Sequence, residues 1–349
     1  FSSPDSQMER HVMDALFPDT TYGVESGGNP DDIPNLTQEG FAAFHAKYYH
    51  PSNSYIFLYG DMDIDQTLAF IDGEYLSQFR LQNVDSTIGR QAFPGSAVKT
   101  YPYGIASGEK TEHKTLHSLT YVIDQALDPT VALAFKVLTY VLLQSPAAPL
   151  KKALVDAGLG KDISGDFQDG ILQPLWGISV NGSDPDKQDK IMPIVTDVLR
   201  RMVKDGLDKT LLTGALNRTE FILREADFVG RPKGLIYGIR CMDTWLYDMD
   251  PLAALSYEAP WMCCAAASTT ATLRPHPEIH PRQSLLRPGL PGTGTGPDRT
   301  ARQGPGRQAG CLQGFALERR NRRHRSRLPG PAEAAGHAGL AGSPGTIPT

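Results

Sequence analysis

Residues 115–246 alternate between apolar strand candidates and amphipathic helix candidates, and this alternation limits the fold more than any other feature of the chain. The runs Thr115–Ile123 and Leu172–Val180 predict strands. Helices are predicted over 132–143, 149–157, 186–203, 209–228 and 232–246. Strands that alternate with such helices indicate an α/β fold with α+β layers, in which helices pack on mixed sheets.

An earlier stretch, Leu36–Asp63, predicts a helix, a sharp polar corner and a strand. Thr37 suits an N-cap, and the aromatic residues Phe41, Phe44 and Tyr48 follow on one helical face. A proline disfavours helical geometry in the residue before it, so the His50-Pro51 step ends this helix. The apolar run Ser54–Tyr59 then predicts a strand buried on both faces.

The charge of the chain is divided between two parts. Residues 1–258 carry 22 Lys and Arg against 35 Asp and Glu, whereas residues 259–349 carry 12 Arg, no Lys and 4 acidic residues. The acidic part favours cationic partners through its long-range field. The second part also contains 13 Gly and 12 Pro and lacks helical or strand periodicity. It is therefore predicted to be a disordered tail.

The Arg, Gly, Pro and Ala bias of residues 259–349, without Lys, is what a GC-rich gene gives when it is read out of frame. A frameshifted, non-native tail is the favoured interpretation, and a genuine disordered extension is the alternative. The arginine-rich run 318–327 resembles a nucleic-acid segment but has no interleaved aromatic residue. A nucleic-acid partner is therefore not expected.

The cysteines and apolar runs give no sign of a disulfide framework or a membrane span. Cys241, Cys263, Cys264 and Cys311 have neither metal-site nor disulfide spacing. No apolar run approaches the roughly 18 residues of a spanning helix, so no membrane partner is expected. The chain opens at Phe1 without a signal peptide, which suggests a missing N-terminus and leaves the compartment undetermined, with a soluble cytoplasmic protein favoured.

Several long motifs resemble one protein family. The segments ALFPDTTYGVESGGNPDDIPNLT and FHAKYYHPSNSYIFLYGDMD resemble the presequence-protease branch of the insulinase/pitrilysin zinc metallopeptidases. The segments APLKKALVDAGLG, LWGISVNG and GLIYGIRCMDTWLYDMDPLAAL resemble the second domain of the same branch. The resemblance implies four similar domains around a chamber in which one zinc ion cleaves peptides. It implies the end of a first domain (1–82) and most of a second, non-catalytic domain (109–258), followed by the tail (259–349). Between the two domains, residues 83–108 show little periodicity and contain Pro94, Pro102 and Gly104, which favours a connector.

The zinc motif of that family is absent from this sequence. The family holds zinc with H-x-x-E-H and a more distant carboxylate, and no H-x-x-E-H occurs among the 349 residues. The resemblance places every metal ligand before Phe1 and the substrate-stabilising residues in a missing C-terminal half. We therefore predict no catalytic, cofactor-binding or metal-binding residue in this chain, and zinc only in the intact enzyme.

The histidines are the first candidates for a metal site, and each has a simpler interpretation. His113 and His117 on one strand face lie about 13 Å apart at ~3.3 Å per residue, too far for one zinc. His45 and His50 are interpreted as packing or turn residues, and His11 has no partner at a ligand spacing.

The remaining candidate motifs also lack the context that their chemistry needs. Gly27-Gly28 does not follow a strand or open a helix, so a phosphate loop is not expected. Ser26 and Ser179 lack the G-x-S-x-G elbow of a hydrolase. The acidic clusters lack an EF-hand pattern and suit helix capping or an acidic chamber wall; they are Asp31-Asp32, Asp61/Asp63/Asp65 and Asp184/Asp186.

Two functions remain open at this point. The favoured one is a fragment of a zinc metalloendopeptidase, inactive alone, whose intact form degrades peptides, with basic peptides as the expected class. Its partners would be the missing catalytic domain and C-terminal half. The alternative is a non-catalytic structural or peptide-binding subunit of the same superfamily, so the sequence does not decide whether the chain is an enzyme.

Overall fold

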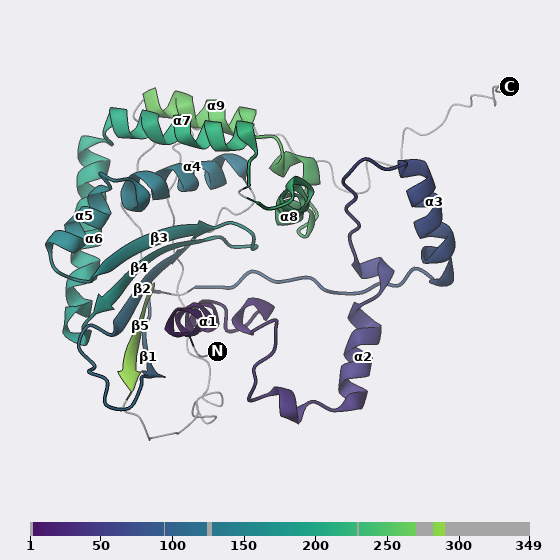
Figure 1. The fold of residues 1–349 in the computed structure, drawn as a ribbon, viewed down its shortest axis with the longest axis horizontal. Coiled ribbons are helices and arrows are strands. Elements are labelled where there is room, and N and C mark those ends of the chain that lie inside the picture. Colours follow the sequence, from purple (N-terminus) through teal and green to yellow (C-terminus); the bar gives the residue numbers. More distant parts are fainter. Residues whose placement is uncertain (1–2, 94, 124–127, 229, 270–281, 290–349) are drawn as a thin grey trace. The chain divides into compact units, whose positions relative to one another are not determined.

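A mixed five-stranded sheet forms the centre of the computed structural model, which describes residues 3–93, 95–123, 128–228, 230–269 and 282–289 (Figure 1). The strands are β1 (Val98–Gly104), β2 (Thr115–Val122), β3 (Asp162–Gln168), β4 (Leu175–Ser183) and β5 (Arg282–Gly289). Their order is β1-β5-β2-β4-β3. Only β1 and β5 pair in parallel, and each other neighbouring pair is antiparallel.

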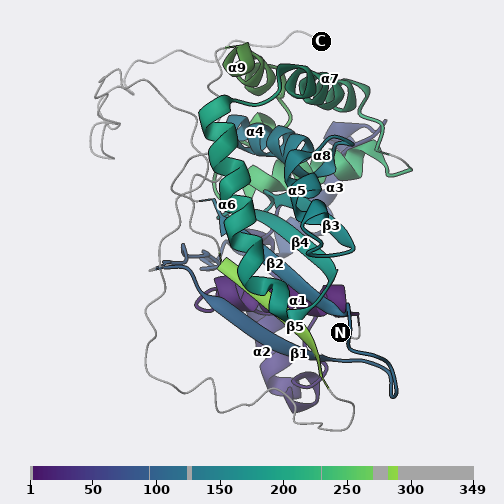
Figure 2. The ribbon, with the colours of Figure 1, turned by 90° about the vertical axis from the view of Figure 1, so that its left-hand side faces the viewer.

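Helices cover both faces of this sheet, as the α/β expectation requires (Figures 1 and 2). Along the chain these are α1 (Pro4–Leu16), α4 (Pro129–Thr139), α5 (Pro149–Asp156), α6 (Gln188–Asp205), α7 (Lys209–Glu225), α8 (Lys233–Trp245) and α9 (Glu258–Thr269). A π-helix, Tyr140–Gln144, continues α4. Short 3-10 helices occupy Thr21–Gly23, Ile33–Asn35, Pro51–Asn53, Leu76–Gln78, Pro185–Lys187 and Pro251–Ala254.

The alternation of side chains along the strands produces two hydrophobic clusters. Leu119, Trp176 and Ile178 point to the larger cluster, which α4 to α7 and α9 complete. Leu116, Val122 and Leu175 belong to the other cluster, where α1 contributes Met8, Val12 and Leu16. Every residue of β2 is buried, so this strand forms the middle of the molecule's packing.

The structure confirms the predicted strands near 115–123 and 172–180 and corrects the prediction at Ser54–Tyr59, which form no strand. No described strand pairs with this segment, and the side chains of Ile56 and Tyr59 are 47% and 55% exposed. An apolar run supplies strand propensity, but a strand needs a hydrogen-bonding neighbour. The flanking helices α2 (Gln38–Tyr48) and α3 (Ile64–Glu74) also contain no buried residue.

Two helix boundaries agree with the predicted capping chemistry. Thr37 Oγ1 accepts a hydrogen bond from Gly40 N at 3.1 Å, which satisfies a free amide at the start of α2. Asp63 Oδ1 does the same for Gln66 N at 3.0 Å in α3. Gly158 adopts a φ of 64° just after α5, a conformation that favours glycine over residues with a Cβ.

The prediction that disorder starts at Ala259 is wrong for the first part of that region. Residues Glu258–Thr269 form α9, and Trp261, Cys264 and Ala267 pack against the larger cluster at a spacing of three. Residues 282–289 form β5. The Ala-rich start of the region has enough helix propensity and apolar surface to join the core. The arginine-rich run 318–327, Cys311 and the rest of the tail lie outside the described residues.

One stretch, residues 129–156, is long and apolar enough to cross a membrane by composition, contrary to the sequence expectation. Its most apolar window is 61% buried inside the protein. Val137, Leu142 and Leu150 within it are fully buried in the larger cluster. Two core helices and the π-helix between them therefore account for its composition.

Gly165 in β3 is packed so closely that adding one methyl group there should lower the stability of the fold. A Cβ there would lie 2.2 Å from Leu143 Cδ1 and 2.8 Å from Gly177 O. We expect Gly165→Ala to reduce the free energy of unfolding in urea by about 1–3 kcal/mol through overpacking. The matched variant Gly214→Ala, in open space on α7, should instead add about 0.5–1 kcal/mol. A neutral or stabilising Gly165→Ala would contradict this packing.

Candidate functional site

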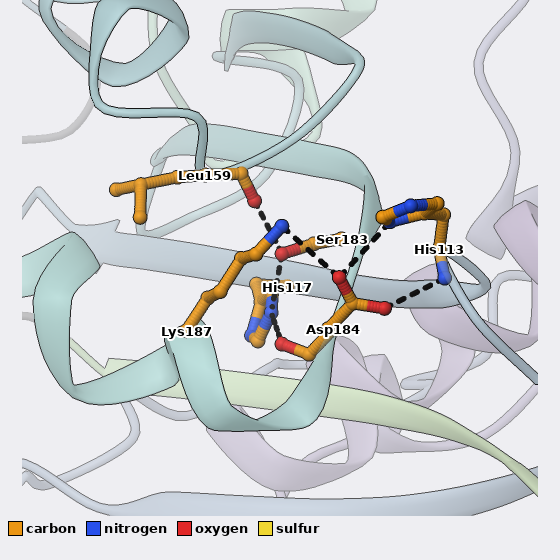
Figure 3. Close-up of polar contacts among 6 residues, drawn as sticks. All are labelled: His113, His117, Leu159, Ser183, Asp184 and Lys187. Carbon is orange, nitrogen blue, oxygen red and sulfur yellow. Dashed lines mark hydrogen bonds and ion pairs between the residues drawn. The ribbon is translucent and has the colours of Figure 1, made fainter.

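The first candidate pair, His113 and His117, lies at the start of β2 beside the end of β4 (Figure 3). His113 comes just before the strand with a φ of 56°, and its backbone N donates to Asp184 Oδ1 at 2.6 Å. Its ring Nδ1 lies 2.9 Å from Asp184 Oδ2, which also pairs with Lys187 Nζ at 3.0 Å. His113 and Lys187 thus surround one carboxylate.

His117 is buried and contacts different atoms of the same segment. Its Nε2 lies 3.1 Å from Ser183 Oγ and 3.2 Å from Asp184 O. The Ser183 hydroxyl donates its one hydrogen to Leu159 O, so it accepts from His117. Nε2 therefore carries a proton and points to oxygen acceptors. A metal-binding nitrogen would instead need a free lone pair.

These contacts make the histidine cluster a clamp that fixes the end of β4 to the start of β2. The hydrogen bond from His113 N, followed by that from Lys187, lowers the pKa of Asp184 to about 2. No group of three His, Cys, Asp or Glu within the described ranges is placed to hold a metal ion. The zinc ion that the family resemblance implies therefore finds no fitting ligand set there.

The other histidines pack against aromatic rings. His11 stacks on Tyr101 with ring centroids 3.9 Å apart, and burial lowers the pKa of His11. His45 stacks on Tyr49 at 4.7 Å. His50 Nδ1 accepts from Ser52 N at 3.1 Å, which holds the corner after α2. His50 therefore lies in the turn expected for it, whereas His45 is itself exposed and contacts an exposed ring at the end of its own helix.

The glycine, serine and acidic candidates do not come together in the structure. Gly28 is in a turn with a φ of 85°, Ser26 is exposed in the same loop, and Ser179 lies within β4. Asn29 Nδ2 donates to Asp32 Oδ2 at 3.2 Å within that loop. Asp61, Asp63 and Asp65 surround the start of α3, whereas Asp184 and Asp186 follow β4.

A cavity of about 420 Å³ between α4, α7 and α8 is the site that the sequence interpretation missed. Its apolar lining includes Leu133 on α4, Phe167 on β3 and Ile222 on α7, and its charged groups come from four separate segments. Lys136 Nζ pairs with Asp169 Oδ2 at 2.6 Å, and the Arg218 guanidinium lies 4.5 Å from the centroid of the Tyr140 ring.

Among the carboxyl groups that line this cavity, Asp243 on α8 has the pKa that is raised furthest. Burial, and then the charge of Asp169, raise the pKa of its carboxyl to about 6, although Lys136 and Arg240 act in the opposite direction. A Cβ at Gly170 would lie 3.2 Å from Asp243 Oδ1, so the backbone passes close to the carboxylate. The only sequence signal for this site is a set of charged residues on the otherwise apolar faces of α4, α7 and α8.

Exposed aromatic side chains also occur on α2, α3 and the segment that follows α3. We call Phe41, Phe44, Phe70, Tyr75 and Phe79 the aromatic face, and each is between 49% and 60% exposed. The segment between the two helices contacts α8, where Tyr55 lies 4.6 Å from Trp245 by ring centroids. So many exposed large apolar side chains on two helices that are neighbours in sequence are typical of a segment that takes part in an interface.

Comparison with known proteins places these features in a family context. The family model described as the peptidase M16 inactive domain matches residues 35–219. Protein HypA of Clostridium perfringens is 48% identical over 259 residues, which are 74% of this chain and 27% of that protein. Presequence protease 1, chloroplastic/mitochondrial, of Arabidopsis thaliana is 36% identical over 267 residues, or 74% of this chain and 24% of that protein. The chain spans about a quarter of the length of the curated relatives it matches.

Solved structures share the fold at low sequence identity. A peptidase M16 inactive domain from Pseudomonas fluorescens has a TM-score of 0.57 at 18% identity, covering 83% of this chain and 66% of that one. The ferredoxin protease FusC, solved in complex with Arabidopsis ferredoxin, has a TM-score of 0.56 at 14% identity, covering 82% and 30%.

The clamp at Asp184 generates a pH-dependent prediction for stability. A folded-state pKa near 2, below the ordinary value of 3.8, means that the charged carboxylate stabilises the fold above pH 3.8. This contribution is lost as the pH falls through about 2. Asp184→Asn should therefore lower the urea midpoint at neutral pH, and its difference from the native chain should shrink between about pH 5 and pH 2.

The matched control is Asp186→Asn, which removes an exposed carboxylate two residues away. It should leave the urea midpoint unchanged across the same pH range. An Asp184→Asn variant whose difference from the native chain does not depend on pH would show that the charge of this carboxylate plays no part.

Proposed function

The chain belongs to the peptidase M16 family, and we propose that it forms part of a zinc metalloendopeptidase that degrades peptides in an enclosed chamber. The observation that carries this proposal is the match of residues 35–219 to the inactive domain of the family. The coverage of about a quarter of the curated relatives supports the idea that the complete enzyme is longer.

Within that enzyme, this chain supplies wall and scaffold and leaves the metal to another segment. The sequence has no H-x-x-E-H motif, and the described side chains include no three-ligand cluster. We assign residues 1–82 to the end of a first domain, 83–108 to a connector and 109–258 to a non-catalytic second domain. Because α9 and β5 belong to the fold, the non-native extension is proposed only for residues 290–349.

The aromatic face has a role in the same proposal. A lone segment with helices α2 and α3 cannot bury Phe41, Phe44 and Phe70 by itself, since each is more than half exposed. We propose that the zinc-bearing part of the first domain covers these rings. Each ring is already partly buried, so completing its burial would contribute about 1–2 kcal/mol to the association.

The direct test is the metal content and peptidase activity of the purified chain. We expect no stoichiometric zinc by elemental analysis and no cleavage of a fluorogenic basic peptide. The intact Arabidopsis presequence protease is the positive control under the same conditions. Cleavage by the chain alone that a chelator abolishes, together with stoichiometric zinc, would overturn the proposal.

The aromatic face provides a second test, which separates an enzyme fragment from an independent structural subunit. The segment that precedes the matching region in the Clostridium relative should bind this chain. Binding should reduce the fluorescence of a hydrophobic dye that is added to the chain, because it covers the exposed rings. Phe41→Asp should weaken that association by at least about tenfold. Val155→Asp, which alters an exposed apolar residue on α5, should not. An absence of binding would favour the non-catalytic subunit.

A further inference from the structure

The cavity between α4, α7 and α8 has no role in the proposed scaffold, and its size suits a ligand. Its volume of about 420 Å³ lies in the range of small-molecule and side-chain sites in proteins. Leu133, Phe167 and Ile222 line an apolar part of the cavity, and Leu223 extends it. An apolar lining with a few charged groups favours a ligand that has both an apolar stem and a polar end.

Two carboxylates of this cavity, Asp166 and Asp243, have no ion pair among the described residues, and burial raises the pKa of both; Asp243 is the one on α8. No described residue donates a hydrogen bond to its carboxylate or forms an ion pair with it, whereas Asp169 is already paired with Lys136. The Asp243 side chain is half-buried beside Gly170. Removing a carboxylate from water without a partner is costly, so a cation from outside would relieve that cost.

The surroundings of Asp243 include groups of both signs. Those that influence it electrostatically are Arg240, Cys241 and Tyr247 from the α8 region, Asp169 from the loop after β3, and Lys136 from α4. Lys136 and Arg240 only partly offset burial and Asp169, because the pKa of Asp243 remains raised to about 6. Lys136 and Arg240 therefore do not satisfy this carboxylate.

A rare backbone conformation contributes to the lining of the cavity. The π-helix Tyr140–Gln144 places both of its end residues in the lining. Gln144 Nε2 donates to Gly165 O at 3.0 Å, which ties the π-helix to β3. Single-turn π-helices are found often at functional sites. Here the π-helix presents the Tyr140 ring on which Arg218 lies.

We propose that this cavity binds the basic side chain of a peptide, with the guanidinium or ammonium group on Asp243 and the methylene stem along the apolar lining. Lysine and arginine bury their stems and keep their charge at a polar end, which matches the distribution of groups in the cavity. A guanidinium also pairs with a carboxylate through two parallel hydrogen bonds. The acidic balance of residues 1–258 attracts such ligands over a longer range.

Binding of N-acetyl-arginine amide to the full chain, measured by calorimetry, tests the proposal. The matched probe N-acetyl-citrulline amide has nearly the same shape and no charge. We expect saturable binding of the arginine probe and at least about tenfold weaker binding of the citrulline probe. Affinity should fall as the pH is lowered from about 7 to 5, because protonation of Asp243 near pH 6 removes its charge.

Three variants locate the binding group. Asp243→Asn should abolish binding, whereas Asp197→Asn, which neutralises an exposed carboxylate on α6, should leave it unchanged. Arg218→Ala should retain binding of the arginine probe, because Arg218 would act only on an anionic ligand. Circular dichroism establishes that each variant is folded, and the comparison of probes and the pH series need no variant.

The proposal is overturned by equal binding of the two probes, by undiminished binding to folded Asp243→Asn, or by no saturable binding at all. Loss of binding in Arg218→Ala but not in Asp243→Asn would assign the cavity to anionic ligands instead. The inference goes beyond the proposed peptidase function. Since binding is measured without cleavage, either proposal can fail while the other stands.

Discussion

The burial of β2 on both faces is the constraint on which the rest of the structure depends. A strand without an exposed residue needs neighbours at both edges and cover above and below. The helices after residue 128 cover one face, and α1 covers the other with Met8, Val12 and Leu16. Trp176 Nε1 donates to Thr139 Oγ1 at 2.9 Å, which satisfies the polar atom of the largest buried side chain and ties β4 to α4.

Both clusters of polar groups depend on this packing. The clamp around Asp184 forms where β2 and β4 lie side by side, and the cavity is lined by residues of α4, α7, α8 and β3. One is closed by short hydrogen bonds, so its groups satisfy one another. The other leaves Asp243 without a partner, which is the physical difference between a structural cluster and a candidate binding site.

The sequence predicted the parts of the fold whose pattern is local. Thr115–Ile123 and Leu172–Val180 are continuous apolar runs, and the helices after them have clear stripes, so both were identified. β3 was missed because DISGDFQ mixes Asp, Gly and Ser with only two apolar residues, and β1 because Pro102 and Gly104 suggested a connector. Ser54–Tyr59 has strand composition without a pairing partner. The cavity escaped because Lys136, Arg218 and Asp243 are distant in sequence, and only packing brings them together.

The place of β5 in the sheet sets an order in which the chain can fold as it is synthesised. β2, β4 and β3 are complete once residue 183 has been made, and they pair with one another. β1 has no such partner among them, because β5 lies between β1 and β2. β1 therefore waits for residue 289 before it can join the sheet, although it precedes β2 in the chain. Contacts of such long sequence separation form slowly, so the edge beyond β2 should be the last part of the sheet to assemble.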